Sequence, residues 1–112
     1  MKQCKATIKM IHSAIIPYVP ELNKLFKKNK IEKAYLFGSA VTENFKDTSD
    51  VDIIVKIDES LDPIEAGGNL WNLIDEMEQV LNRRVDLLTE RSLRNPYLIE
   101  EINRTKVAIY GN

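Results

Sequence analysis

The stretch Tyr35-Leu-Phe-Gly-Ser39, with Asp50-Val-Asp-Ile-Ile-Val55 beyond a ten-residue interval, decides how this chain folds. It predicts an apolar strand, a Gly-Ser turn, an excursion over residues 40–49 and a second apolar strand that opens with two aspartates. Side chains at positions i and i+2 of a strand point to the same side. We therefore expect Asp50 and Asp52 to project together, while the apolar residues of the second strand turn inward.

Two adjacent carboxylates are costly without a cation, because like charges raise each other's pKa. A divalent metal removes that cost, and all-oxygen ligation suits Mg²⁺ or Mn²⁺ rather than zinc. Upstream, Gly38 lets the backbone approach a ligand closely, and Ser39 is a candidate cap for a helix whose free N–H groups favour an anion. The pattern therefore predicts a single site for a metal and a phosphate.

This arrangement, Phe37-Gly-Ser39 followed after ten residues by Asp50-Val-Asp-Ile53, resembles the signature of the polymerase-beta-like nucleotidyltransferase superfamily. The resemblance covers residues 31–110, which is most of the chain. The small size is similar to that of the minimal nucleotidyltransferases, and in particular to the antitoxin type that pairs with HEPN toxins. The resemblance therefore implies both an enzyme class and a kind of partner.

The activity implied is a metal-dependent transfer of a nucleoside monophosphate, expected to be AMP from ATP, onto an acceptor hydroxyl. By this resemblance Asp50 and Asp52 hold two Mg²⁺ (or Mn²⁺) ions, and Gly38 and Ser39 bind the β- and γ-phosphates. Asp86 binds the metal near the acceptor hydroxyl and favours its deprotonation. The implied acceptor is a tyrosine of a HEPN-type toxin, which makes the protein an antitoxin.

Asp86 also has a structural interpretation. It is the only charged residue of a predicted strand over Val85–Thr89. Taken alone, it is equally well explained as an exposed residue on an edge strand. Beside two other strand carboxylates, a third place in the site becomes the better interpretation.

The chain departs from the antitoxin-type pattern just after the Gly-Ser pair. Those proteins often continue as Gly-Ser-x-Ala-Arg-Gly, whereas Thr42 and Glu43 occupy the arginine and glycine positions here. The loss of an arginine and the gain of a carboxylate put nucleotide affinity or the usual acceptor in question. The predicted metal carboxylates are not affected.

Outside the two strands of the opening stretch, the chain shows helical periodicity in four places and strand character in two. Helices are predicted over Cys4–Ile16, from Pro20 to about Asn29, from about Asn69 to Asn82 with Gly67-Gly68 breaking or preceding it, and onward from Asn95-Pro96. Strands are predicted over Lys33–Phe37, Val51–Ile57 and Val85–Thr89, with Val107–Tyr110 as a short strand or tail.

This order predicts an α+β (mixed α/β) fold of nucleotidyltransferase type. Its small mixed sheet has three to four strands, and its helices pack mainly on one face. The connection over residues 40–49 is too short for a crossover helix, so the first two strands should be antiparallel neighbours. A helix separates the second and third strands, which can therefore run parallel. Residues 1–112 are expected to form a single domain.

Four side-chain interpretations accompany these elements. His12 is expected at a polar position on the first helix, rather than as a base or ligand. Trp71 is interpreted as a core or partner-interface residue more readily than as a base-stacking platform. Leu98 and Ile102 are expected to face inward from the last helix.

Composition restricts the partners. The chain has 112 residues, 16 basic and 17 acidic, for a net charge of -1. Direct binding along a nucleic-acid backbone, which usually needs a basic excess, is therefore not expected. Cys4 is the only cysteine, and no run has the length of a membrane span, so we expect a cytoplasmic protein without a disulfide or membrane partner. Lys9 and His12 interrupt the apolar start, which argues against a signal peptide.

Two functions of different class remain open. In the first, the protein is an active nucleotidyltransferase whose partners are a nucleoside triphosphate, expected to be ATP, and a HEPN-type toxin. In the second, it is a catalytically weak binding module that neutralises a helical partner by occlusion. Intact Asp50, Asp52 and Asp86 favour the first function, and Thr42 with Glu43 favours the second. Modification of a small molecule such as an aminoglycoside is a weaker third reading, and a homodimer is left open.

Overall fold

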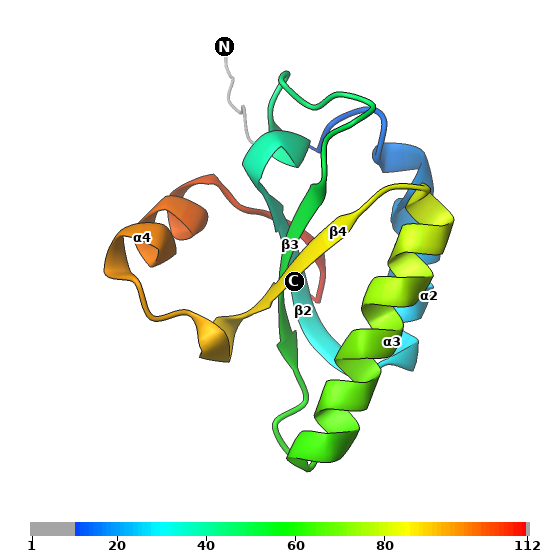
Figure 1. Ribbon diagram of the computed structural model, residues 1–112, viewed down its shortest axis with the longest axis vertical. Coiled ribbons are helices and arrows are strands. Elements are labelled where there is room, and N and C mark those ends of the chain that lie inside the picture. The colour runs from blue at the N-terminus through cyan, green and yellow to red at the C-terminus, as the bar shows by residue number, and fades with distance from the viewer. Residues whose placement is uncertain (1–10, 112) are drawn as a thin grey trace.

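The computed structural model describes residues 11–111 and contains a four-stranded mixed sheet in the order β4-β3-β2-β5 (Figure 1). The strands span β2 (Ile31–Phe37), β3 (Val51–Ile57), β4 (Val85–Thr89) and β5 (Val107–Tyr110), and the α-helices span α2 (Val19–Lys28), α3 (Pro63–Leu81) and α4 (Pro96–Thr105). Short 3₁₀ helices lie at η1 (Ile16–Tyr18), η2 (Gly38–Val41) and η3 (Glu90–Ser92). The expected mixed fold is confirmed.

Strand pairing follows the expected connections. β2 and β3 are antiparallel, with Phe37 opposite Asp52, and β3 and β4 are parallel, with Asp52 opposite Asp86. β5 returns antiparallel to the other side of β2 and makes the second edge of the sheet. The strand order places β3 in the interior of the sheet, so the strand that carries Asp52 has a neighbouring strand on each side.

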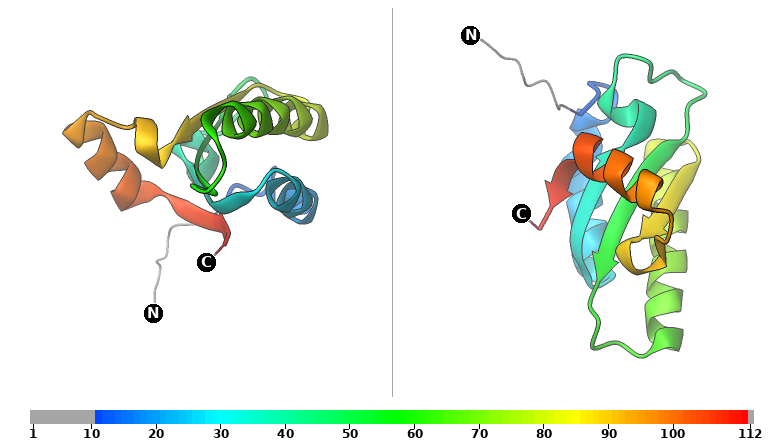
Figure 2. Two further views of the ribbon diagram at one scale, coloured as in Figure 1. Left: turned by 90° about the horizontal axis from the view of Figure 1, so that it is seen from below. Right: turned by 90° about the vertical axis from the view of Figure 1, so that its left-hand side faces the viewer.

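The two faces of the sheet are covered by different helices. α2 and α3 lie side by side on one face and α4 lies on the other, as both views in Figure 2 show. Apolar residues alternate along β3: Val51, Ile53 and Val55 belong to the cluster under α2 and α3, while Ile54 belongs to a smaller cluster with Tyr35 and Ile102. The expectation that helices pack mainly on one face is thus confirmed.

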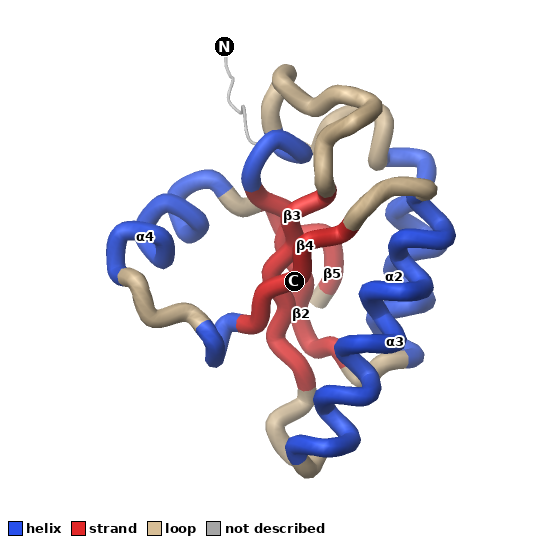
Figure 3. Tube along the Cα trace, viewed as in Figure 1, coloured by secondary structure: helices blue, strands red, loops and turns tan. Residues whose placement is uncertain are grey.

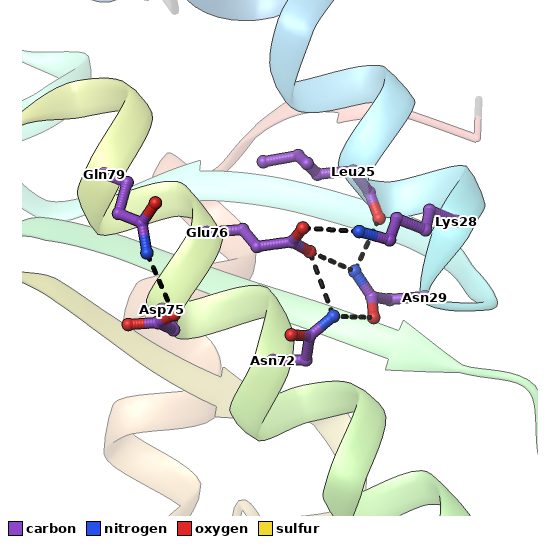
Figure 4. Close-up of polar contacts among 7 residues, drawn as sticks. All are labelled: Leu25, Lys28, Asn29, Asn72, Asp75, Glu76 and Gln79. Atoms are coloured by element: carbon purple, nitrogen blue, oxygen red, sulfur yellow. Dashed lines mark hydrogen bonds and ion pairs between the residues drawn. The ribbon is translucent and has the colours of Figure 1, made fainter.

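A polar network joins α2 to α3 at the rim of the larger cluster (Figure 4). Asn29, only 2% exposed, donates from Nδ2 to the Leu25 carbonyl at 3.0 Å and to Glu76 Oε1 at 3.2 Å. Asn72 donates to both Asn29 Oδ1 and Glu76 Oε1, at 3.1 and 3.0 Å. Lys28 completes the network by donating to Glu76 Oε2. The buried amide therefore has partners for both of its polar atoms, as burial requires.

The third helix starts earlier than the sequence indicated. α3 begins at Pro63, capped by Asp62, whose carboxylate accepts from Glu65 N at 2.9 Å, and it runs through Gly67 and Gly68 without a break. The prediction that these glycines break or precede the helix was wrong. An Asp cap followed by Pro is a strong start signal, and two helical glycines weaken a helix without ending it.

Two side-chain expectations on the later helices need correction. Trp71 is 77% exposed, which rules out the core alternative and leaves the partner-interface alternative as a prediction. Leu98 is 41% exposed, whereas Ile102, one turn further along α4, is 2% exposed and buried as expected. α4 begins at the cap Asn95, so its first turn, which carries Leu98, lies beyond the apolar cluster that Ile102 reaches.

Most of the helix predicted over Cys4–Ile16 lies outside the described residues. Within the described part, a turn over residues 13–15 precedes η1, so the chain around His12 is not helical. His12 Nδ1 accepts from Ala14 N at 3.1 Å, and its backbone N–H donates to the Ala40 carbonyl at 2.9 Å. His12 therefore fixes the entry of the chain against η2, rather than occupying a helix surface. α2 itself, with Leu22, Leu25 and Phe26 buried, agrees with the prediction.

Candidate active site

Asp52 and Gly38 form the centre of the candidate site, at the end of the sheet where β2 stops and β3 starts. Gly38 has φ +69°, a left-handed conformation that favours glycine. A Cβ at position 38 would collide with the Asp52 Oδ2 atom. Glycine is therefore favoured at position 38 for two reasons: the positive φ, and the lack of space for a Cβ beside the Asp52 carboxylate.

Asp52 and Asp86 lie on the face of the sheet that α4 covers. Asp52 is half-buried between inward-facing Val51 and Ile53, and Asp86 lies opposite it in the parallel register of β4. Asp50 immediately precedes β3 and is exposed, as is Asp86. The structure therefore brings together, around one strand end, the three aspartates that the sequence singled out.

Electrostatics supports this grouping. Burial, followed by the negative charges of Asp86 and then Asp50, raises the pKa of the Asp52 carboxyl above its ordinary value. A raised pKa means that the ionised form is held at a cost. A cation bound beside Asp52 would offset that cost.

The donor set fits a hard cation, but the protein does not form a complete cage. Among residues 11–111, no set of three His, Cys, Asp or Glu side chains converges closely enough to hold a metal by itself. Mg²⁺ commonly takes only one or two carboxylates and completes its coordination with water and substrate phosphates. Asp50, Asp52 and Asp86 provide oxygen ligands alone, so they fit Mg²⁺ or Mn²⁺ bound together with a nucleotide.

Ser39 lies inside η2 and is not the cap that we expected. η2 begins from Phe37 without a side-chain cap, and it is a single 3₁₀ turn, not an α-helix. The Ser39 carbonyl accepts from the Thr42 backbone N–H at 3.0 Å and from Thr42 Oγ1 at 2.9 Å. Asn44 N in turn donates to Thr42 Oγ1 at 3.1 Å. Thr42 therefore closes the turn that follows the Gly-Ser pair, a role that the sequence did not reveal.

Arg83 holds the loop that leads into Asp50. Its Nη1 donates to the Lys46 carbonyl at 2.8 Å and to the Ser49 carbonyl at 3.0 Å, and its guanidinium lies 4.3 Å from the ring centre of Phe45. Phe45 is buried, and its ring centre is 5.1 Å from that of His12. The lone aromatic in a polar loop was the available signal for such an anchor.

A small pocket adjoins the carboxylates, between η2 and α4. Its volume is about 210 Å³, and one wall is the Phe37-Gly38 backbone. The opposite wall comes from α4, which the sequence did not connect with the site. The lining consists of Phe37, Gly38, Val41, Thr42, Leu98, Glu101, Ile102 and Thr105.

Comparison with known proteins agrees with this geometry. The profile of the family described as "Polymerase beta, Nucleotidyltransferase" matches residues 20–112. The chain belongs to this nucleotidyltransferase family. The enzyme class that the Gly-Ser and Asp-x-Asp pattern implied is therefore confirmed.

Individual relatives narrow the resemblance. A Methanocaldococcus jannaschii protein named as a protein adenylyltransferase is 33% identical over 82 residues, which make up 73% of this chain and 80% of that protein. A toxin–antitoxin crystal structure with AMP-PNP aligns at TM-score 0.67 and 28% identity, over 84% of this chain and 73% of that chain. A structure of a tri-AMPylated Shewanella oneidensis HEPN toxin in complex with MNT antitoxin aligns at TM-score 0.60 and 26% identity, over 87% and 72%.

These likenesses agree with the recognition of a minimal nucleotidyltransferase of the antitoxin type. They do not test the roles of individual residues in this chain, so the assignments of Asp50, Asp52, Asp86, Gly38 and Ser39 stay predictions. Within residues 11–111, no helix is both long and apolar enough to cross a lipid bilayer.

Proposed function

We propose that this nucleotidyltransferase moves AMP from ATP onto a tyrosine hydroxyl of a HEPN-type toxin and thereby acts as its antitoxin. The observation that carries the proposal is the register of Asp52 with Asp86 on neighbouring parallel strands, with Asp52 packed on Gly38. This places two carboxylates beside a left-handed backbone position that favours glycine and where a Cβ would collide with Asp52. The AMP-PNP and AMPylated-toxin complexes of the structural relatives support the choice of nucleotide and acceptor.

In this proposal each group of the chain has a separate task. Gly38 and Ser39 hold the β- and γ-phosphates, and Asp50, Asp52 and Asp86 hold Mg²⁺ or Mn²⁺, which neutralises charge at the reacting α-phosphate. Asp86, at the exposed edge strand, is the carboxylate nearest an incoming acceptor and takes the proton of its hydroxyl. The acceptor oxygen bonds to the α-phosphorus, the bond to the bridging oxygen breaks, and pyrophosphate leaves.

Transfer of label from ATP tests the reaction. The protein is incubated with Mg²⁺, a purified HEPN-family toxin and ATP labelled at the α-phosphate. We expect label on a toxin tyrosine, no label from γ-labelled ATP, and no transfer with chelator. Label from γ-labelled ATP would make the protein a kinase, and equal transfer with chelator would remove the metal from the proposal.

A second function, neutralisation by occlusion, is favoured by one observation. Thr42 uses its hydroxyl to close the turn after the Gly-Ser pair, and Glu43 beside it is exposed, so neither supplies a cation to a triphosphate. Asp52→Asn separates the two functions. If the variant still neutralises the toxin in equal amounts, while transfer is lost, occlusion is sufficient. If neutralisation is lost with transfer, the enzyme reading stands.

A further inference from the structure

The outer side of α3 carries large apolar side chains that nothing in the described fold covers. Ile64 is 88% exposed and Trp71 is 77% exposed. An open groove of about 600 Å³ runs beside them, lined by Gly68, Trp71, Asn72, Ile74, Asp75 and Glu78. Residues on this side of α3 are spaced by four and three positions in alternation, and we call this set the α3 seam: Ile64, Gly68, Trp71, Asp75 and Glu78. This spacing lines up one face of a helix as in paired helices.

The pair Gly67-Gly68, of which Gly68 belongs to the seam, has no explanation inside the fold. A Cβ at Gly67 or at Gly68 would meet nothing within 4 Å, and neither residue has a positive φ. Glycine is the poorest helix former apart from proline, so alanine would stabilise α3 at either position. A reason for glycine is available outside the chain, because glycine lets a second backbone come close to the helix.

The charges on α3 indicate what kind of partner could bring its backbone close to Gly68. α3 contains Glu65, Asp75, Glu76 and Glu78 and no lysine or arginine. Glu76 is paired with Lys28 on the side that faces α2 (Figure 4), and Glu78 is partly buried and accepts from the Val85 N–H at 2.9 Å. Among the described residues no ion pair neutralises Glu65, Asp75 or Glu78. A second copy of this helix would bring like charges together, and an anionic lipid surface would also be repelled. A basic partner is attracted.

We propose that the α3 seam is the docking surface for a basic amphipathic helix of a protein partner. Apolar residues of the partner cover Trp71 and approach the backbone at Gly68, and its lysines or arginines, a turn or two further along, lie against Asp75 and Glu78. α3 and α4 lie on opposite faces of the sheet (Figure 2), and Asp52 points to the α4 side as Ile54 does. This docking therefore does not depend on nucleotide transfer.

Trp71 is the only tryptophan of the chain, so its fluorescence reports directly on the seam. Two synthetic helical peptides of about 18 residues are compared, with the same leucine stripe and either lysine or glutamate on its flanks. We expect the lysine peptide to shift Trp71 emission to shorter wavelength in a saturable way, and to bind several-fold more weakly at about 0.5 M salt than at about 0.05 M. The glutamate peptide should leave the emission unchanged. Equal binding of both peptides would overturn the proposal.

Two variants locate the binding on the seam. Gly68→Leu fills the groove with a better helix former, so we expect the melting temperature to rise by about 4 °C while the affinity for the lysine peptide falls at least about tenfold. Asp75→Lys should weaken binding by a similar factor. Glu100→Lys, an equal charge change on α4, is the matched control and should bind as the unmodified protein does. A Gly68→Leu protein that binds normally would place the peptide elsewhere.

The other occupants of this surface give different signals. If the Trp71 emission of the protein alone shifts with its concentration, and sedimentation shows a dimer that Gly68→Leu abolishes, the seam contacts a second copy. If anionic phosphatidylserine vesicles shift the emission, it contacts a membrane. Either result would overturn the proposal of a basic partner helix.

Discussion

The sheet has one face that is closed and one that is largely open. Under α2 and α3, a continuous apolar cluster extends from Ile15 to Ile109, and the Asn29 network seals its rim. Under α4, the buried apolar residues of the described chain are Tyr35, Ile54 and Ile102, and this face also carries the candidate carboxylates and a small pocket. Four apolar residues pack against this cluster and are only partly buried: Phe37, Leu88, Leu93 and Ala108. The contrast is visible in Figure 3, where α2 and α3 lie together on one side of the strands and α4 stands alone on the other.

This difference separates stability from chemistry. The closed face supplies the burial that holds β3 in place, and β3 presents Asp52 to the open face at a cost in electrostatic free energy. Mutations on the two faces should therefore fail in different ways. Losses on the closed face should unfold the protein, and losses on the open face should inactivate it while leaving it folded.

Phe26→Ala should have the largest effect on folding. Phe26 is fully buried on α2, with its ring centre 5.4 Å from that of Tyr110 on β5. Truncating a buried aromatic removes transfer free energy and leaves a cavity, a combined cost of about 3–5 kcal/mol in the free energy of unfolding. Urea denaturation followed by circular dichroism measures this cost.

Ile102→Ala is the matched change on the open face. Ile102 is equally buried but belongs to the smaller cluster under α4, most of whose other members are only partly buried. We expect its cost at the lower end of the range for such truncations, about 2 kcal/mol. Equal costs for the two variants would show that α4 is packed as tightly as α2 and would remove the contrast between the faces.

Asp52→Asn should have the opposite effect: it should remove activity and leave the folding stability intact. Transfer should fall at least about a hundredfold, the usual range for loss of a reacting or ligating group. The folded pKa of Asp52 is raised, so without metal the folded protein loses stability as pH rises from the ordinary value of 3.8 through the raised value, and Asn removes that loss. The variant should therefore melt no lower than the unmodified protein at pH 7.

A melting temperature that drops at pH 7 would contradict this assignment, because it would make the Asp52 carboxylate a stabilising group of the fold. Asp86→Asn provides the companion measurement on β4. It should also reduce transfer about a hundredfold while nucleotide binding is kept. Unchanged transfer would return Asp86 to the alternative of an exposed edge-strand residue.

The closed face was the more predictable of the two. Its strands alternate apolar residues in a regular way, and β3 and β4 were placed at their observed bounds because Val51–Ile57 and Val85–Thr89 are bounded by polar turns. The start of α3 was missed because the glycine pair was given more weight than the Asp62 cap and Pro63. The helix predicted over Cys4–Ile16 falls mostly on residues that the structure does not describe. Leu98 was misplaced because periodicity gives no distance to the cluster that a helix must reach.

The open face was predictable only in its carboxylates. Asp50, Asp52 and Asp86 could be found because strand periodicity and spacing are local signals. The Arg83 anchor, the closure of the turn by Thr42 and the α4 wall of the pocket are contacts between residues far apart in sequence or between side chain and backbone. A single sequence carries no direct record of such contacts, so they required the folded structure.

Glu43→Arg should have a smaller effect, on nucleotide affinity. The structure shows that Thr42 closes the turn, so only its exposed neighbour should be changed. Replacing a negative by a positive charge near the phosphates is worth on the order of 1–2 kcal/mol at an effective dielectric of about 20. This corresponds to a roughly five- to thirtyfold lower dissociation constant for ATP with Mg²⁺, measured by calorimetry at low salt.

Glu59→Arg is the control for this change, because Glu59 lies in the loop after β3, at the other end of the sheet (Figure 1). It alters the net charge equally and should leave ATP affinity nearly unchanged. Equal tightening by both variants would indicate a general charge effect, and the loop after the Gly-Ser pair would then be remote from the phosphates.

Glu76→Gln should have the smallest effect, and it tests the closed face through its dependence on pH. Hydrogen bonds from Lys28 first and then Asn29 lower the pKa of the Glu76 carboxyl below its ordinary value of 4.5. A lowered folded pKa stabilises the protein above the unfolded pKa, and this contribution is lost as pH falls through the folded value. The Lys28 side chain is exposed and the Glu76 side chain is partly exposed, so solvent screening limits the contribution to below about 1 kcal/mol. The difference in unfolding free energy between the unmodified protein and the variant should therefore be small at pH 7 and shrink further below about pH 4.5. A difference that stays constant down to pH 3 would assign the role of Glu76 to hydrogen-bond geometry, which glutamine also disturbs, and not to its charge.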